Sequence, residues 1–156
     1  MKSKKHLTYC VCCHGKYKRT QENLTNHREF TDSLKNFNVS FEEVNTDDYK
    51  NWGGMSGLLS MYLDTNPNLP EDGYLVSFED DFIFLNEDAL INAINVLEEK
   101  SNTLNLAYVG HGNHNLNEHG YKTASHHSST YGNHCKWTDG GVYIFKNKKL
   151  LEIKNK

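Results

Sequence analysis

The chain has no apolar run long enough to span a bilayer. Residues 6–14 are too short and too mixed for the apolar part of a signal peptide, so we expect no secretory signal. It also has no excess of basic charge: 17 Lys and Arg stand against 20 Asp and Glu, and the formal net charge is -3. These absences disfavour general nucleic-acid binding and predict a cytoplasmic protein without a transmembrane segment. Lysines near both ends leave weak contact with a membrane surface as an option.

Cysteine is scarce, with 4 residues, and no C-x-x-C spacing is present. Cys10, Cys12 and Cys13 crowd the first expected strand and Cys135 lies far along the chain, so we expect reduced thiols. A zinc site of Cys10, Cys12, Cys13 and His14 is an alternative, although alternate residues of a strand point to opposite faces. A chain of 156 residues can bury a core without disulfides.

Strand and helix periodicities follow one another along the chain. The expected strands are residues 7–13, 39–44, 75–78, 106–109 and 142–145; the expected helices are residues 20–36, 55–63, a segment capped by Asn86, and 146–156. This order predicts an α/β fold, a mainly parallel central sheet flanked by helices, in a single domain over residues 1–156. The polar stretch 110–136 is expected to be a long functional loop.

Three consecutive carboxylates, Glu79, Asp80 and Asp81, stand between two blocks of strand-forming apolar residues. Adjacent anions near a buried strand end repel one another, so a cation is the favoured compensator; a solvated polar turn is the alternative. Ligands of open α/β sheets bind beyond the carboxyl ends of strands, where this triplet lies. Hard oxygen ligands favour Mg²⁺ or Mn²⁺, which commonly join carboxylates to a diphosphate.

With this triplet in place, the chain resembles glycosyltransferases of the GT-A fold, and more narrowly glycosyltransferase family 25. The resemblance rests on the order of four pieces: Arg19 in a loop after the first strand, the glycine-rich residues 53–60, residues 75–81, and Asp139-Gly140-Gly141 before an aromatic strand. Met61 stands where that family often has a histidine. The chain is short for the family, which implies a minimal catalytic domain or a part of a longer polypeptide.

The resemblance implies a hexosyltransferase-like enzyme that moves a sugar from a nucleotide sugar, with a UDP-sugar as the favoured donor, to a glycan or lipid-linked acceptor, with inversion. In such an enzyme we expect Asp81 to be the main metal ligand, Glu79 to be a second ligand or an anchor of the turn, and Asp80 to contact ribose or sugar hydroxyls. Strand alternation places Glu79 and Asp81 on one side and Asp80 on the other. The cofactor is Mn²⁺ or Mg²⁺, with the metal as Lewis acid.

The remaining candidate residues lie on the flanking loops. Lys16 or Arg19 is expected to contact phosphate, or is a solvated loop cation. Asp47 is expected to bind the base or ribose, or belongs to a turn. Gly54, with Gly53 and Gly57, lets the backbone approach the ligand closely, or lets a helix entrance pack tightly. Asp139 is the candidate general base, or a turn cap. His134, or else His126 or His127, is the candidate for a further metal ligand, or is a polar loop residue.

Two rival functions use the same residues differently. In the first, the chain is a noncatalytic domain in which several late histidines and Cys135 bind zinc, and the acidic triplet is a solvated turn. In the second, the protein is a metal-dependent phosphate-ester hydrolase.

Overall fold

A five-stranded central sheet organises the computed structural model, which describes residues 4–82, 84, 86–99, 106–109, 127–128, 133–134 and 142–154. Its strands, in spatial order, are β2 (Phe37–Asn45), β1 (Lys5–Cys13), β3 (Gly73–Glu79), β7 (Val142–Lys146) and β4 (Leu106–Val109). β1 is parallel to β2 and to β3, whereas β7 is antiparallel to both β3 and β4. Every strand except β7 therefore points the same way, which confirms the prediction of an α/β fold with a mainly parallel sheet.

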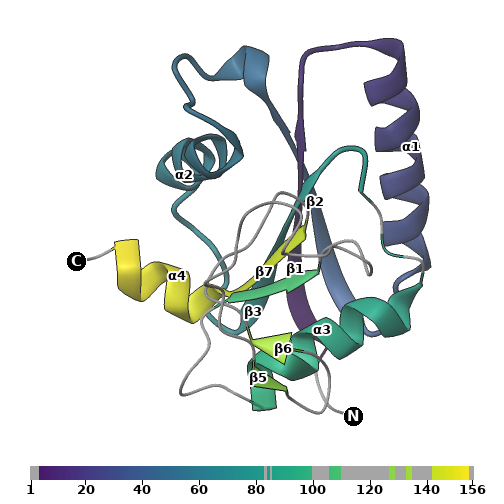
Figure 1. Cartoon of the computed structure of the whole chain (residues 1–156), viewed down its shortest axis with the longest axis vertical. Helices are drawn as coiled ribbons and strands as arrows, with labels where there is room; N and C mark the ends of the chain where they lie inside the picture. Colours follow the sequence, from purple (N-terminus) through teal and green to yellow (C-terminus); the bar gives the residue numbers. More distant parts are fainter. Residues whose placement is uncertain are drawn as a thin grey trace.

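Helices cover both faces of this sheet (Figure 1). On one face, α1 (Lys18–Ser33) packs against Leu7, Tyr9 and Val11 of β1, and α3 (Glu87–Glu99) covers β4 and β7. On the other face, α2 (Met55–Thr65) packs against Cys10 and Cys12 of β1, and α4 (Asn147–Lys154) covers β3 and β7. The period-two alternation of β1 thus divides the core into two layers.

The predicted elements are present, with shifted ends. α1 begins and ends earlier than predicted, and β2, β3 and α2 extend beyond the predicted ranges. The predicted helix cap at Asn86 is confirmed, since its Oδ1 accepts a hydrogen bond from the Ala89 amide at 3.0 Å. The loop prediction for residues 110–136 is wrong in one respect, because β5 (His127–Ser128) and β6 (Asn133–His134) form an antiparallel pair within it.

The three cysteines of β1 are buried and free, as predicted. The Cys12 Sγ lies 3.7 Å from the Ser77 hydroxyl, and the Cys13 thiol donates to the Val44 carbonyl at 3.9 Å. Burial raises the pKa of Cys12 to about 11 and that of Cys13 to about 12, so both thiols are neutral. Within the described residues, no three of Cys10, Cys12, Cys13 and His14 converge into a metal-binding group, so the geometry gives the alternative zinc site no support.

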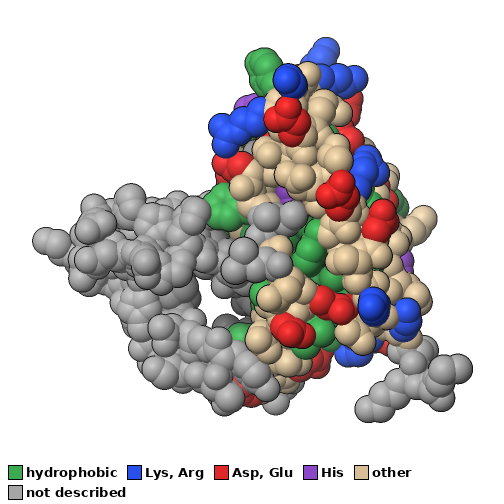
Figure 2. Space-filling view, turned by 90° about the vertical axis from the view of Figure 1, so that its right-hand side faces the viewer, with side chains coloured by type: hydrophobic (Ala, Val, Ile, Leu, Met, Phe, Trp, Pro, Cys, Tyr) green, Lys and Arg blue, Asp and Glu red, His purple; other side chains and the backbone are tan. Residues whose placement is uncertain are grey.

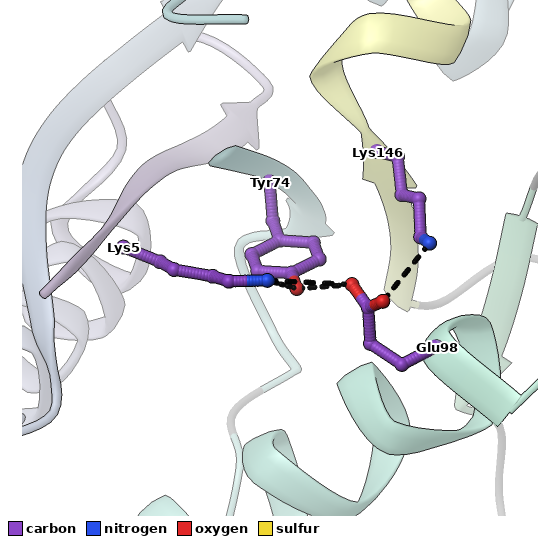
Figure 3. Close-up of polar contacts among 4 residues, drawn as sticks. All are labelled: Lys5, Tyr74, Glu98 and Lys146. Carbon is purple, nitrogen blue, oxygen red and sulfur yellow. Dashed lines mark hydrogen bonds and ion pairs between the residues drawn. The ribbon is translucent and has the colours of Figure 1, made fainter. Parts of the chain in front are cut away.

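A network of charged residues joins four elements at the edge where β1 and β3 begin (Figure 3). Lys5 Nζ donates to the Tyr74 hydroxyl at 2.8 Å, and that hydroxyl donates to Glu98 Oε1. Lys146 Nζ donates to Glu98 Oε2 at 3.1 Å, and Lys5 lies 3.6 Å from Oε1. Partial burial would raise the pKa of Glu98, but the hydrogen bonds from Tyr74 and Lys146 outweigh it and leave the pKa lowered.

Replacing Glu98 should cost stability in a pH-dependent way. Because the folded-state pKa is lowered, the stabilisation is present above the unfolded pKa and is lost as the pH falls through the folded value. We expect Glu98→Gln to lower the free energy of unfolding by about 1 kcal/mol near neutral pH, because the pairs are partly exposed, with little difference from wild type once the pH is below the lowered folded-state pKa of Glu98. Urea unfolding across this pH range measures it.

The matched control is Glu152→Gln, which removes one exposed pair between Lys149 and Glu152 on α4. This variant should lose only about 0.3 kcal/mol. Equal losses for the two variants would contradict a network at Glu98.

Candidate functional site

Parallel pairing brings several chain segments to one edge of the sheet. The carboxyl ends of β1 and β2 are paired at Cys13 and Asn45, and Glu79 ends β3 opposite Cys12. β7 starts at the same edge, because Val142 pairs with Phe78 of β3 and with Val109, the last residue of β4. We call this the carboxyl edge. The acidic triplet follows β3 there, where open α/β sheets bind ligands.

The loops after β1 and β2 are joined into one unit. The buried Asn45 donates from Nδ2 to the Gly15 carbonyl at 3.1 Å, and its Oδ1 accepts from the Asp47 amide at 2.9 Å. The Gly15 amide donates to Thr46 Oγ1 at 3.3 Å. These bonds present the exposed side chains of Lys16 and Asp47 from a single connected surface. Of the predicted residues, this surface brings Lys16 and Asp47 together.

An aromatic pair lies beside these loops. The rings of His14 and Trp52 meet edge to face with centroids 5.0 Å apart, and His14 Nδ1 lies 3.5 Å from Thr46 Oγ1. Trp52 is half-buried against the core layer beneath α2. Residues from separate segments form this pair, so sequence reasoning missed it.

Arg19 lies in the first turn of α1, close in sequence to the exposed Lys16 and Lys18. Lys18 forms an exposed ion pair with Glu22 at 3.7 Å, whereas Arg19 has no ion pair within the described part of the chain. Figure 2 shows one face of the molecule, with basic side chains gathered at its top. The beginning of α1 lies at the top of the molecule in Figure 1. Lower on the face of Figure 2, charges of both signs alternate. Free amides at a helix start add partial positive charge.

The three glycines at the start of α2 are required for different structural reasons. Gly53 and Gly54 have φ values of +66° and +99°, which L side chains rarely adopt, and Gly54 is the N-cap of α2. Gly57 lies inside the helix, where an added Cβ would come 1.7 Å from the Trp52 carbonyl oxygen. Tight packing of the helix entrance, the alternative given above, therefore explains Gly57.

The acidic triplet forms the turn that ends β3. The Asp80 amide donates to the Cys12 carbonyl at 3.0 Å and continues the pairing with β1; the Phe82 amide donates to the Glu79 carbonyl at 3.0 Å. Asp80 faces α1, where Asn23 Nδ2 donates to its Oδ2 at 2.8 Å. Glu79 is half-buried and Asp81 is exposed. No three His, Cys, Asp or Glu side chains among the described residues converge into a metal-binding group.

Two residues of α1 contact the turn and were missed by sequence reasoning. Asn23 bonds the Asp80 carboxylate, and His27 Nε2 lies 3.0 Å from the Asp80 carbonyl oxygen. His27 is 1% exposed, and desolvation lowers its pKa despite the opposing effect of Asp80. The available signal was their spacing of four residues on the face that also carries Leu24.

Several predicted residues fall outside the described residues. Asp139 is one of them, together with His126 and Cys135. His134 belongs to β6, where its backbone pairs in register with His127 of β5. The roles of Asp139 and His134 therefore stay predictions from the sequence.

Neither a scan against protein-family models nor a search of curated proteins returns a match for this chain. The likeness to glycosyltransferase family 25 accordingly rests on the order of its motifs. In the part of the chain that the structure describes, no helix is both long and apolar enough to cross a membrane.

The close contact at Gly57 predicts a large effect for a small substitution. Alanine in a helix interior is normally favoured over glycine by about 1 kcal/mol, but overpacking against a backbone carbonyl costs typically 1–3 kcal/mol or more. We expect Gly57→Ala to lower the free energy of unfolding by about 2 kcal/mol, because backbone cannot move aside as a side chain can. Urea unfolding measures the loss.

Ser60→Ala, at an exposed position of the same helix, is the control and should change stability by less than about 0.5 kcal/mol. A Gly57→Ala variant as stable as this control would show that the helix entrance is looser than the structure has it.

Proposed function

We propose that the protein is a metal-dependent glycosyltransferase that transfers a sugar from a nucleoside-diphosphate sugar to a glycan or lipid-linked acceptor. The observation that carries the proposal is the meeting of four features at the carboxyl edge: loop cations, a loop carboxylate, an aromatic pair and the acidic turn. Each is suited to a different part of a nucleotide sugar. The mainly parallel sheet flanked by helices agrees with the fold that the resemblance implies.

The diphosphate is the leaving group, and its developing charge must be stabilised. Asp81 is exposed on the turn and Glu79 is half-buried beside it, so both offer hard oxygen ligands to Mn²⁺ or Mg²⁺. Such ions commonly bind through one or two carboxylates and fill the other positions with phosphate oxygens and water, so the two carboxylates of this turn can suffice. A bound cation would neutralise charge on the departing diphosphate.

Two basic residues, Lys16 and Arg19, are suited to bind the phosphate groups of the donor. Lys16 is exposed in the loop after β1, and Arg19 is exposed in the first turn of α1. Cations and free helix amides next to a phosphate act as electrostatic stabilisers without changing protonation. We assign Lys16 and Arg19 to the diphosphate.

The nucleoside end of the donor belongs at the ends of β1 and β2. Asp47 is exposed there, on loops held together through Asn45, and its carboxylate suits the hydroxyls of a ribose. The His14 and Trp52 rings supply an apolar surface next to it. The positive φ of Gly53 and Gly54 lets the backbone turn sharply beside this surface.

Inverting transfer also needs a base that removes the proton of the acceptor hydroxyl. Asp139 is our candidate for that role, and His134 is the candidate for an additional metal ligand. The first described residue after Asp139, Val142, starts β7 at the carboxyl edge.

The proposal is tested by thermal unfolding with UDP, MnCl₂ and both together, extended to a panel of nucleoside diphosphates and sugar nucleotides. At about 100 times the dissociation constant, ligand binding adds about 2.7 kcal/mol, which raises the unfolding midpoint of a chain of this size by roughly 5–10 °C. We expect this rise only when nucleotide and Mn²⁺ are both present. Asp81→Asn should abolish it, because the first metal ligand is lost.

Glu71→Gln is the matched control, since Glu71 is an exposed carboxylate before the other end of β3. It should keep the full rise. No response to any nucleotide, with stoichiometric zinc retained through purification, would refute the proposal in favour of the zinc-binding domain. Sugar-nucleotide turnover that needs no acceptor would favour the hydrolase.

A further inference from the structure

Asp80 is held at three of its atoms by two different elements. Its amide donates to Cys12 of β1 at 3.0 Å, as a continuation of the sheet. Its carbonyl oxygen lies 3.0 Å from His27 Nε2, and its Oδ2 accepts from Asn23 Nδ2 at 2.8 Å. Backbone and side chain are therefore both restrained, at the middle residue of the acidic turn.

Hydrogen-bond chemistry fixes the form of His27. A carbonyl oxygen only accepts, so His27 Nε2 carries the proton that it donates to Asp80. In the neutral ring, Nδ1 then accepts from the Tyr9 hydroxyl 2.8 Å away. This makes a chain of donors from Tyr9 in β1, through α1, to the acidic turn.

Stability alone gives little reason for this chain. Tyr9 and His27 are 0% and 1% exposed, and their rings pack against Phe78 with centroid distances of 4.5 and 5.2 Å. Replacing both members of a buried hydrogen-bonded pair by apolar groups of similar shape can be nearly neutral. Here such a replacement would also remove the donor of the Asp80 carbonyl oxygen. A buried hydroxyl and imidazole in an aromatic cluster thus point to a purpose at the other end of the chain, which is Asp80.

We propose that Asn23 and His27 are positioning residues that preset the Glu79–Asp80–Asp81 turn for ligand binding. This inference rests on the proposed function for the identity of the ligand, but the restraint itself belongs to the free protein. Both partners are neutral donors, so they orient Asp80 without cancelling its charge. A turn ordered before binding loses less entropy when the ligand arrives.

The first experiment measures the turn without ligand, by amide hydrogen exchange in the double variant Tyr9→Phe/His27→Leu. This variant removes the donor chain and keeps an apolar core. We expect the amides of Asp80 and Phe82 to exchange about tenfold faster, because the carbonyl restraint is lost, while the Val76 amide in the middle of β3 keeps its protection. His27→Gln, whose amide can still donate to the Asp80 carbonyl, should exchange more slowly than the double variant.

The second experiment measures binding of UDP with MnCl₂ by calorimetry, in Asn23→Ala and in the control Asn26→Ala. Asn26 is exposed on the same helix. Loss of a residue that orients a binding group typically costs 10–100-fold in affinity. We expect at least about a tenfold loss for Asn23→Ala and none for Asn26→Ala, with unfolding midpoints within about 2 °C of each other.

The two experiments separate this inference from the proposed function. Turn amides that keep the wild-type exchange rate in the double variant would overturn the positioning role, whatever the protein binds. So would an Asn23→Ala variant that binds UDP and Mn²⁺ as tightly as wild type. If the wild type itself binds no nucleotide, the proposed function fails, and the exchange rates alone decide whether Asn23 and His27 order the turn.

Discussion

The parallel pairing of β1 with both β2 and β3 is the constraint on which the candidate site depends. Residues 7–13 of β1 are all buried, and the strand is covered by α1 on one face and by α2 on the other. A parallel arrangement needs a crossover helix for each connection, so the loops that leave the strands collect at one edge. Loop residues such as Lys16 and Asp47, which are far apart in sequence, therefore lie on neighbouring loops at that edge.

Carboxylates have different kinds of partner at the two ends of the sheet. Where β1 and β3 begin, Glu98 pairs with both Lys5 and Lys146, so its negative charge is fully compensated within the fold. At the carboxyl edge, Asp80 is held by an amide and a neutral imidazole instead. Neutral donors hold Asp80 in place and leave the charge of its carboxylate uncompensated, which costs more to maintain than a paired charge.

Much of the architecture could be predicted because local pattern and tertiary environment agree. Alternation along residues 7–13 matches a strand with two covered faces, and Asn86 caps α3 as its sequence context predicts. The antiparallel insertion of β7 between β3 and β4 could not be predicted, because periodicity does not report strand direction. Asn23 and His27 were missed for a related reason: a polar residue on a helix reveals nothing about its partner across the core.

The sequence by itself determined the order of strands and helices, the placement of three carboxylates at a strand end, and their alternation, which assigned Asp80 to the opposite side from Glu79. These properties follow from the period of the backbone and from neighbouring residues. Only the tertiary structure decided which element Asp80 faces, that Gly57 serves helix packing, and that His14 meets Trp52. Each depends on contacts between segments brought together by the burial of β1, and such contacts leave no local periodic signal.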